Sequence, residues 1–307
     1  MSNRILSPAV ALGCLALLLM AAGCGRTQSS VGPTDSIRSS TSRADAAALA
    51  RLETADARED GKEDDNDDSW RSRATLITAP TVITSPGDYR LAADLDVKEG
   101  DGIVIRANDV RVWLGERTLR GPGNKSGRAI VLDGVQRVVV RGGHIERFGF
   151  GAVLMGSSDC RVRGLAVRGG DETADPANGN PPQIGLMLVN SAHNRIRNNQ
   201  LSGVNLGIFV RGAGSYENVI RGNEVTAGQN GLLGICYNPA PGGDAAGPMR
   251  DRVSRNTLAR FGTGISVSAG SMENRFIANS IGYFNSPYED LNGTNVFERN
   301  TSKRLVR

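Results

Sequence analysis

The chain has few of the residues from which metal, redox and aromatic stacking sites are usually built. Its 307 residues include only 2 His and 4 Cys, and aromatic residues make up 5% of the total. No Cys-x-x-Cys pair and no histidine cluster occurs in the sequence, which argues against a Cys/His metal site. After residue 24 only Cys160 and Cys236 remain, and their spacing does not indicate a disulfide. We expect two buried thiols.

Long apolar runs are also scarce. Beyond the N-terminus the runs are three to five residues long, too short for helices. β-branched and aliphatic residues fill them, and Gly, Asn and Ser separate them. This composition predicts short strands joined by tight corners.

One pattern recurs five times in the last third of the chain: Asn, any residue, apolar, two residues, Asn, any residue, apolar. The copies are residues 194–201, 218–225, 251–258, 274–281 and 295–302, with Asp251 and Ser302 as the two departures. The second asparagines lie 24, 33, 23 and 21 residues apart. A period in the low twenties predicts a solenoid, because such a unit is too short to bury a face alone.

Each coil opens with glycine and a short apolar strand, as in Gly151–Leu154 and Gly207–Val210. A polar turn, an alternating strand, a corner Asn or Gly and a third strand follow. Equivalent strands should stack in parallel about 4.8 Å apart. We expect each corner Asn to adopt the left-handed conformation and to bond its counterpart on the next coil. The predicted ladder comprises Asn199, Asn223, Asn256, Asn279 and Asn300.

These features resemble the right-handed parallel β-helix of the pectin-lyase-like superfamily, from about Thr81 to Asn300. The segment Pro86–Leu91, Pro-Gly-Asp-Tyr-Arg-Leu, is similar to the first coil of many members. The resemblance implies an all-β solenoid of roughly eight coils. It does not identify a function, because the superfamily includes lyases, hydrolases, epimerases, binding proteins and scaffolds. A β-sandwich is the alternative fold, disfavoured because sandwich strands vary more in their chemistry.

The N-terminal segment resembles a bacterial lipoprotein signal. An apolar run from Ala9 to Ala22 is followed by Gly23 and Cys24, and it is short of the roughly 20 residues that span a bilayer. We predict a signal peptide at 1–23, lipidation of Cys24, a disordered linker at 24–73 and a β-helix domain at 74–307. Gly25 favours the outer membrane of a Gram-negative envelope. A plain secretory signal and an uncleaved anchor are the alternatives.

Charge divides the linker from the domain. Residues 25–73 carry 8 Lys+Arg against 11 Asp+Glu, and residues 74–307 carry 27 against 21, giving −3 and +6. A basic domain outside the cell suggests an acidic polysaccharide as partner rather than nucleic acid. Neutral-sugar sites usually rely on aromatic faces, which are scarce here, so a charged ligand is preferred.

Arginines mark the predicted outer face of the second strand in each coil. Each follows an inward apolar residue, so we expect them to stack on successive coils: Arg141, Arg163, Arg197 and Arg221. Residues before the apolar position add Arg161, Arg195, Arg252 and Arg275. Stacked like charges are destabilising unless a polyanion offsets them, and Arg suits carboxylates. The alternative is a solvated outer face covered by arginine stems.

Site residues for chemistry are only weakly indicated. Two Pro/Gly-rich insertions interrupt the coils, and the first holds a candidate Ca²⁺ site of Asp171, Glu172 and Asp175. His144 and Tyr237 are the candidate acid-base residues. No catalytic signature of the related enzyme families is found. Asp175-Pro176 lacks the His-Glu that follows in alginate epimerases, and the signatures of polygalacturonases and pectate lyases are missing as well.

We therefore predict recognition of a uronate-type polysaccharide and leave its processing by this protein as an open question. A non-catalytic envelope scaffold or adhesion β-helix protein is the alternative. The last coil has no evident cap, which leaves its strand edges open to a second subunit.

Overall fold

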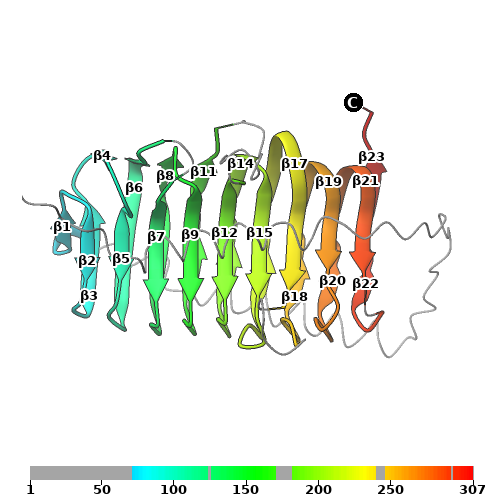
Figure 1. Ribbon diagram of the computed structural model, residues 1–307. Helices are drawn as coiled ribbons and strands as arrows, with labels where there is room; N and C mark the ends of the chain where they lie inside the picture. Colours follow the sequence, from blue (N-terminus) through cyan, green and yellow to red (C-terminus); the bar gives the residue numbers. More distant parts are fainter. Residues whose placement is uncertain (1–70, 124–125, 171–181, 240–245, 292, 307) are drawn as a thin grey trace, which may run out of the picture. The chain divides into compact units, whose positions relative to one another are not determined.

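The computed structural model describes residues 71–123, 126–170, 182–239, 246–291 and 293–306 (Figure 1). The described strands belong to one folded unit that begins at Ala74. Within the described ranges, no helix has the length and apolar character needed to cross a membrane. The predicted signal segment, Cys24 and almost all of the linker lie outside these ranges.

All strands pair in parallel and form three stacks along one axis, which confirms the predicted right-handed parallel β-helix of roughly eight coils (Figure 1). The first stack contains β2 (Thr81–Ile83), β5 (Ile103–Ile105), β7 (Arg128–Asp133), β9 (Phe150–Met155), β12 (Ile184–Val189) and β15 (Leu206–Arg211). The second stack contains β1 (Thr75–Ile77), β3 (Gly87–Leu91), β10 (Arg161–Arg163), β13 (Arg195–Arg197), β16 (Val219–Arg221), β18 (Arg252–Ser254), β20 (Arg275–Ile277) and β22 (Val296–Glu298).

The third stack contains β4 (Leu95–Asp96), β11 (Ala166–Arg168), β14 (Gln200–Val204) and β23 (Thr301–Arg304). Longer strands bend round a corner and serve two stacks. β6 (Val110–Arg120) and β8 (Val139–Glu146) belong to the second and third stacks. β17 (Glu224–Asn238), β19 (Thr257–Val267) and β21 (Ser280–Asp290) belong to the third and first.

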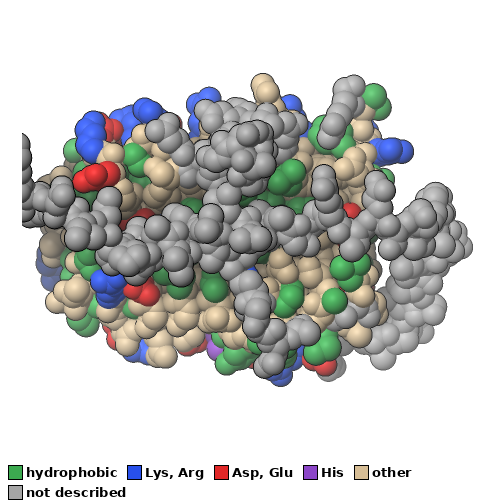
Figure 2. Space-filling view, in the orientation of Figure 1, with side chains coloured by type: hydrophobic (Ala, Val, Ile, Leu, Met, Phe, Trp, Pro, Cys, Tyr) green, Lys and Arg blue, Asp and Glu red, His purple; other side chains and the backbone are tan. Residues whose placement is uncertain are grey.

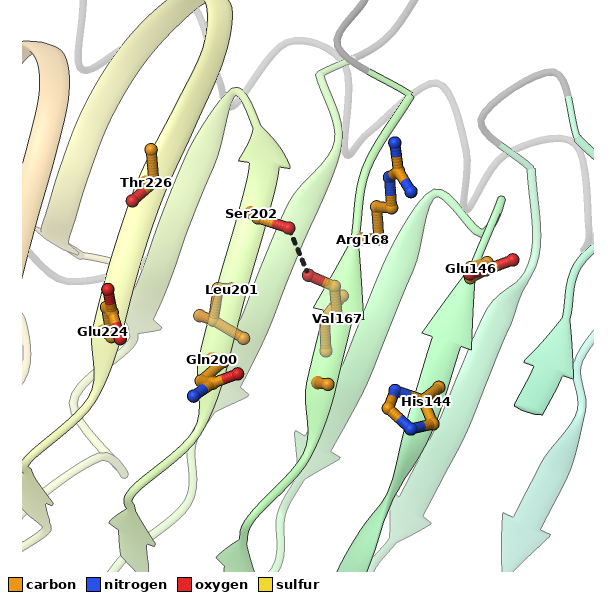
Figure 3. Close-up of a pocket in the computed structure, with 10 residues that line it drawn as sticks. His144, Glu146, Val167, Arg168, Gln200, Leu201, Ser202, Glu224 and Thr226 are labelled. Carbon is orange, nitrogen blue, oxygen red and sulfur yellow. Dashed lines mark hydrogen bonds between the residues drawn. The ribbon is translucent and has the colours of Figure 1, made fainter. Parts of the chain in front are cut away.

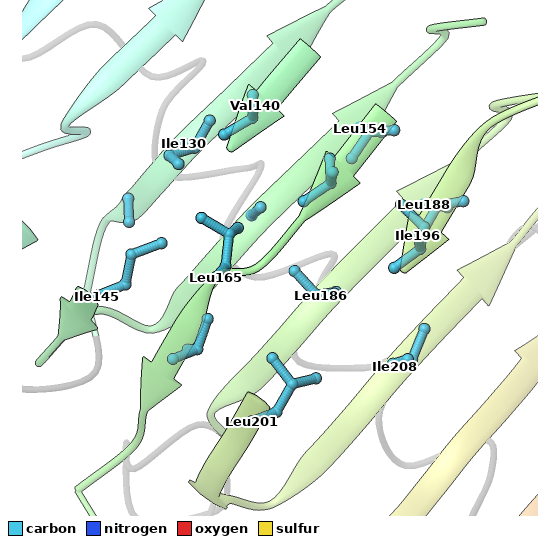
Figure 4. Close-up of a cluster of buried hydrophobic side chains, with 14 of the residues drawn as sticks. Ile130, Val140, Ile145, Leu154, Leu165, Leu186, Leu188, Ile196, Leu201 and Ile208 are labelled. Atoms are coloured by element: carbon cyan, nitrogen blue, oxygen red, sulfur yellow. The ribbon is translucent and has the colours of Figure 1, made fainter. Parts of the chain in front are cut away.

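The core lies inside the coil, where apolar side chains from all three stacks meet (Figure 4). Ile130, Val140, Ile145, Leu186 and Ile196 are all 1% exposed or less. Successive side chains of a strand point to opposite faces, so every second residue points into the core. Full burial of each such side chain contributes about 1.5–3 kcal/mol. The repeat is therefore stable only when stacked.

In the middle of the first stack the outward positions are apolar as well. Val153, Met187, Phe209 and Cys236 follow one another in register on consecutive turns, and each is 1–4% exposed. They belong to a second hydrophobic cluster, separate from the core. Both faces of the stack are thus shielded from water at these turns, whereas Val82 on β2 is 48% exposed.

The two cysteines of the described residues are free and buried, as predicted. Cys160 lies in the core and Cys236 in the second cluster. Burial raises the pKa of the Cys160 thiol to about 11, which leaves it protonated and unreactive at neutral pH.

The structure stacks the asparagines of the expected ladder one above another. Nδ2 of each donates to Oδ1 of the next at 2.9–3.0 Å, through Asn199, Asn223, Asn256, Asn279 and Asn300. Each backbone N–H reaches the same oxygen, as in Asn199 N to Asn223 Oδ1 at 3.0 Å. Each Nδ2 also donates to a carbonyl of the preceding turn, such as Ile196 O at 3.0 Å from Asn223. Buried polar groups at this corner are thereby satisfied.

The left-handed conformation occurs one residue earlier than we expected. Asn198, Gly222, Arg255, Ala278 and Arg299 have φ of 52–65°, whereas the ladder asparagines have no positive φ. The asparagine needs ordinary backbone angles to aim its side chain along the axis. The preceding residue takes the strain of reversing the chain, which costs a non-glycine residue on the order of 1 kcal/mol.

A second ladder, not foreseen from the sequence, runs through the first asparagine of each repeat. It comprises Asn194, Asn218, Asp251, Asn274 and Asn295. Asn194 Nδ2 donates to Asn218 Oδ1 at 3.1 Å, and Asn274 Nδ2 donates to Asn295 Oδ1 at 3.0 Å. Both asparagines of the motif therefore serve the same purpose at two neighbouring corners.

Asp251 interrupts this second ladder. Its Oδ1 accepts from Asn218 Nδ2 at 3.2 Å, and its backbone N–H donates to Asn274 Oδ1 at 3.0 Å. Its Oδ2 stands where the other rungs carry an NH₂, and it accepts from the Tyr237 hydroxyl at 3.1 Å. Burial raises the pKa of Asp251 to about 7, because an ionised carboxylate is poorly solvated here.

Aromatic rings close the C-terminal end of the core. Phe297 stacks on Phe276 at 4.7 Å between centroids and meets Tyr288 at 4.9 Å. In the described part of the chain, β22 and β23 each pair on one side only, with β20 and β21. The core is therefore covered while the last strand edges are not, and assembly through this end stays a prediction.

Replacing Asn223 with Ala should destabilise the fold by about 3 kcal/mol or more. The change removes two donors and one acceptor at a buried site and leaves their partners unsatisfied. Urea unfolding followed by circular dichroism measures this. Thr257→Ala, at an exposed outward position nearby, is the control and should change stability by less than about 0.5 kcal/mol. Equal stability of the two variants would contradict the ladder's role.

Replacing Asp251 with Asn should stabilise the protein, and the gain should grow with pH. The folded pKa is raised, so the wild-type protein loses stability as pH rises from about 4 to about 7. Asn removes this loss and restores the missing donor, a gain on the order of 3 kcal/mol above pH 7. Unfolding at pH 4 and pH 8 tests it, with exposed Asp159→Asn as control. A gain independent of pH would show that Asp251 is ionised in the folded state.

Candidate binding groove

A groove of about 530 Å³ crosses four turns on the outer face of the third stack (Figure 3). It is lined by His144, Glu146, Ala166, Val167, Arg168, Gln200, Leu201, Ser202, Glu224 and Thr226. We call it the third-stack groove. Its polar residues come from β8, β11, β14 and β17, with two outward positions from each strand.

Strand register arranges these positions in two rows. One row runs through His144, Ala166, Gln200, Glu224 and Thr257. The other runs through Arg120, Glu146, Arg168, Ser202 and Thr226. The centre is hollow because Ala166 and Ser202 are short while their neighbours are long. Ser202 Oγ lies close to the strand surface, 3.5 Å from Val167 O (Figure 3).

The charges in the groove are only partly paired. Glu146 Oε2 lies 3.7 Å from Arg120 Nε, and in Figure 3 its carboxylate points away from Arg168. Arg168 and Glu224 form no ion pair with any described residue, and both are exposed. The groove therefore presents one guanidinium, that of Arg168, between two carboxylates: Glu146 on the preceding turn and Glu224 two turns further along.

His144, a predicted acid-base candidate, lies in this groove. Its Nε2 is 3.9 Å from Glu116 Oε2, and its side chain is 48% exposed. The neighbouring turn carries Arg168, so a basic side chain and a guanidinium share one site.

Tyr237, the other candidate, is unsuited to the predicted role. Its side chain is fully buried in the core, and its hydroxyl donates to Asp251. Burial, together with the Asp251 carboxyl, raises the pKa of Tyr237 well above its ordinary value. An inward position of the first stack cannot contact an external polymer, so Tyr237 cannot act as an acid or a base on such a ligand.

The predicted arginines occupy the outer face of the second stack. Arg141, Arg163, Arg197 and Arg221 follow one another in register on consecutive turns. Arg161 pairs with Arg195, but Val219 then separates Arg195 from Arg252 and Arg275. Arg197 is only 5% exposed, and the other three of the first row are partly buried. Polyanion binding by these arginines and a solvated face covered by their stems both stay predictions.

Elsewhere, arginines pair with aspartates across turns. Arg111 Nε lies 2.6 Å from Asp88 Oδ1, and Arg137 Nε lies 2.6 Å from Asp109 Oδ1. On the face shown in Figure 2, acidic and basic side chains lie interspersed along the described residues. Such exposed pairs contribute little to stability. They do reduce the single-sign field expected from the net charge.

The Ca²⁺ candidates Asp171, Glu172 and Asp175 lie outside the described residues. Within the described ranges, no group of three or more His, Cys, Asp or Glu side chains is placed to hold a metal ion.

Most groove residues were missed by the sequence reasoning, although the signal was present. The inward residues of the third strands are Ile145, Val167, Leu201 and Val225. Their neighbours on either side are the groove residues. The rule that identified the arginine row on the second strands, applied to the third strands, finds them all.

The fold matches known proteins only through its architecture. Residues 95–281 match the family model described as "Right handed beta helix region". No curated protein is significantly similar to the sequence.

Among solved structures, a mutant tailspike protein of E. coli bacteriophage HK620 in complex with hexasaccharide is 11% identical, with a TM-score of 0.45. The alignment covers 75% of this chain and 45% of that one. The Dettilon tailspike protein is 13% identical, with a TM-score of 0.48 and coverage of 75% and 55%. The chain thus spans about half the length of these tailspikes. On the family match, which extends over more than half of its residues, the chain belongs to the right-handed β-helix family.

Proposed function

We propose that this protein binds a glycan in the third-stack groove. The observation that carries the proposal is the groove itself, an open depression lined by polar and charged side chains from four successive turns. Amide, hydroxyl, carboxylate and guanidinium groups there match the hydroxyls and charged substituents of sugars. Its direction across stacked strands suits an extended chain.

Binding is favoured over hydrolysis by the carboxylate spacing. Glu146 and Glu224 lie on strands three turns apart, which is about 14 Å at one strand spacing per turn. Glycoside hydrolysis by paired carboxylates needs a separation of roughly 5–9.5 Å. The proximity of His144 to Arg168 supplies the residue types for uronate β-elimination, a second candidate that a product assay separates from binding.

We also propose that the protein acts at the cell envelope, attached through a lipid on Cys24. The small residues before that cysteine and the preceding apolar run support this. The alternative of a non-catalytic scaffold without a glycan ligand predicts no saturable binding of sugars.

Replacing Arg168 with Gln should weaken binding of an acidic oligosaccharide by about tenfold, the effect of one charge-assisted hydrogen bond. Alginate, pectate and glycosaminoglycan oligosaccharides serve as probes, with affinity measured by calorimetry at low and high salt. Arg106→Gln removes the same charge outside the groove, where Arg106 pairs with Asp133 at 2.9 Å. This control should retain affinity.

Equal weakening by both variants would reduce the effect to net charge and contradict the groove. The triple variant Arg163→Ser, Arg197→Ser and Arg221→Ser tests the arginine row of the second stack separately. Ultraviolet absorbance of unsaturated uronates should stay flat during these incubations, and its appearance would establish a lyase.

Replacing Cys24 with Ser should release the protein from the membrane fraction of the producing cell. The serine cannot be lipidated, and the apolar run from Ala9 to Ala22 is short of the roughly 20 residues that span a bilayer. Fractionation followed by immunoblotting measures this. Cys14→Ser is the matched control and should remain membrane-bound. Membrane retention of both variants would refute lipid attachment at Cys24.

A further inference from the structure

We infer that the third-stack groove selects a zwitterionic glycan, one that carries an anionic group and an ammonium group within a short oligosaccharide. This inference rests on the proposed glycan-binding function and specifies its ligand. Its basis is the arrangement of charges along the two rows of the groove.

One end of the groove carries an excess of carboxylates. Glu146 faces Arg120 at 3.7 Å, and Arg120 also approaches Asp94 at 3.3 Å and Asp96 at 3.7 Å. His144 Nε2 lies 3.9 Å from Glu116 Oε2. Because one arginine faces three carboxylates, this end disfavours a ligand that carries negative charge alone.

Arg168 and Glu224 form no ion pair with any described residue. Along its row Arg168 is preceded by Glu146 and followed by the neutral Ser202, Thr226 and Ala259. In the other row Glu224 lies between Gln200 and Thr257, and the next turn brings Ser280. Neutral side chains therefore separate Arg168 from Glu224.

The distance between Arg168 and Glu224 limits the size of the ligand. Arg168 lies on β11 and Glu224 on β17, two turns apart, which corresponds to about 10 Å along the axis. Both side chains rise from the same face, with Gln200 and Ser202 on the strand between them (Figure 3). A disaccharide or trisaccharide spans such a distance.

The chemistry then discriminates between ligand classes. A polyanion satisfies Arg168 but places negative charge beside Glu224, which costs binding energy. A neutral glycan desolvates both charges without an ionic partner. A glycan with a carboxylate or phosphate near Arg168 and an unacetylated amine near Glu224 forms a charge-assisted bond at each end.

Three oligosaccharide probes of equal length test this inference. N-deacetylated hyaluronan oligosaccharides carry both charges, hyaluronan oligosaccharides carry only carboxylates, and chitosan oligosaccharides carry only amines. We expect the zwitterionic probe to bind about tenfold more tightly than either of the others, measured by calorimetry with the purified protein.

Two nearly isosteric variants assign the charges. Glu224→Gln should abolish the preference for deacetylated over acetylated hyaluronan and leave affinity for acetylated hyaluronan equal or higher. Arg168→Gln should abolish the preference for deacetylated hyaluronan over chitosan. The exposed positions of both residues keep the fold intact, which circular dichroism verifies.

These outcomes distinguish failure of the zwitterion inference from failure of the proposed glycan binding. Binding of hyaluronan at least as tight as its deacetylated form, or an unchanged preference in Glu224→Gln, would overturn the zwitterion inference and leave glycan binding standing. If none of the three probes, nor alginate or pectate, binds at all, the proposed function itself fails.

Discussion

The turns between residues 194 and 300 depend on the satisfaction of polar groups at two buried corners of each turn. A coil of this kind must turn its backbone three times per circuit, and each corner would otherwise leave buried N–H groups without acceptors. The two asparagine ladders solve this by passing hydrogen bonds from side chain to backbone and to the next side chain. Hydrophobic stacking then packs the interior against a frame whose register is fixed. Loss of one ladder asparagine leaves hydrogen-bonding groups on both neighbouring turns without partners, so the ladders couple adjacent turns strongly.

The groove follows from the same regularity. Because register is kept from turn to turn, every outward position of the third strands lies beside its equivalent, and surface relief is set only by side-chain size. Ala166 and Ser202 lower the centre, while Arg168 and Gln200 raise its edges. The site requires no special loop or strained backbone among its lining residues. It arises from the types of side chain at equivalent outward positions of regularly stacked turns.

The sequence predicts architecture far better than it predicts the site. The Asn-x-apolar repeat and its period identify the parallel coil, since only stacking satisfies so short a unit. The left-handed residue was misplaced by one position, because a propensity for that conformation does not show which corner residue must aim its side chain. Tyr237 was misjudged because its inward orientation depends on which residue of β17 continues the alternation after a bend. The groove is harder to predict because the outward positions of the third strands carry mixed residue types, whereas those of the second strands repeat arginine.

Because the turns stack at a constant rise, outward side chains on different turns lie at regular intervals along the axis. Along the axis, any two outward side chains on different turns are separated by a whole number of strand spacings, each about 4.8 Å. Duplication of one repeat between β14 and β17 would move Glu224 one strand spacing further from Arg168 along the axis. The contacts between the other turns would not change. Lineages of such proteins can therefore change the spacing that a ligand must match in discrete increments, by gaining or losing turns, without redesigning a binding site.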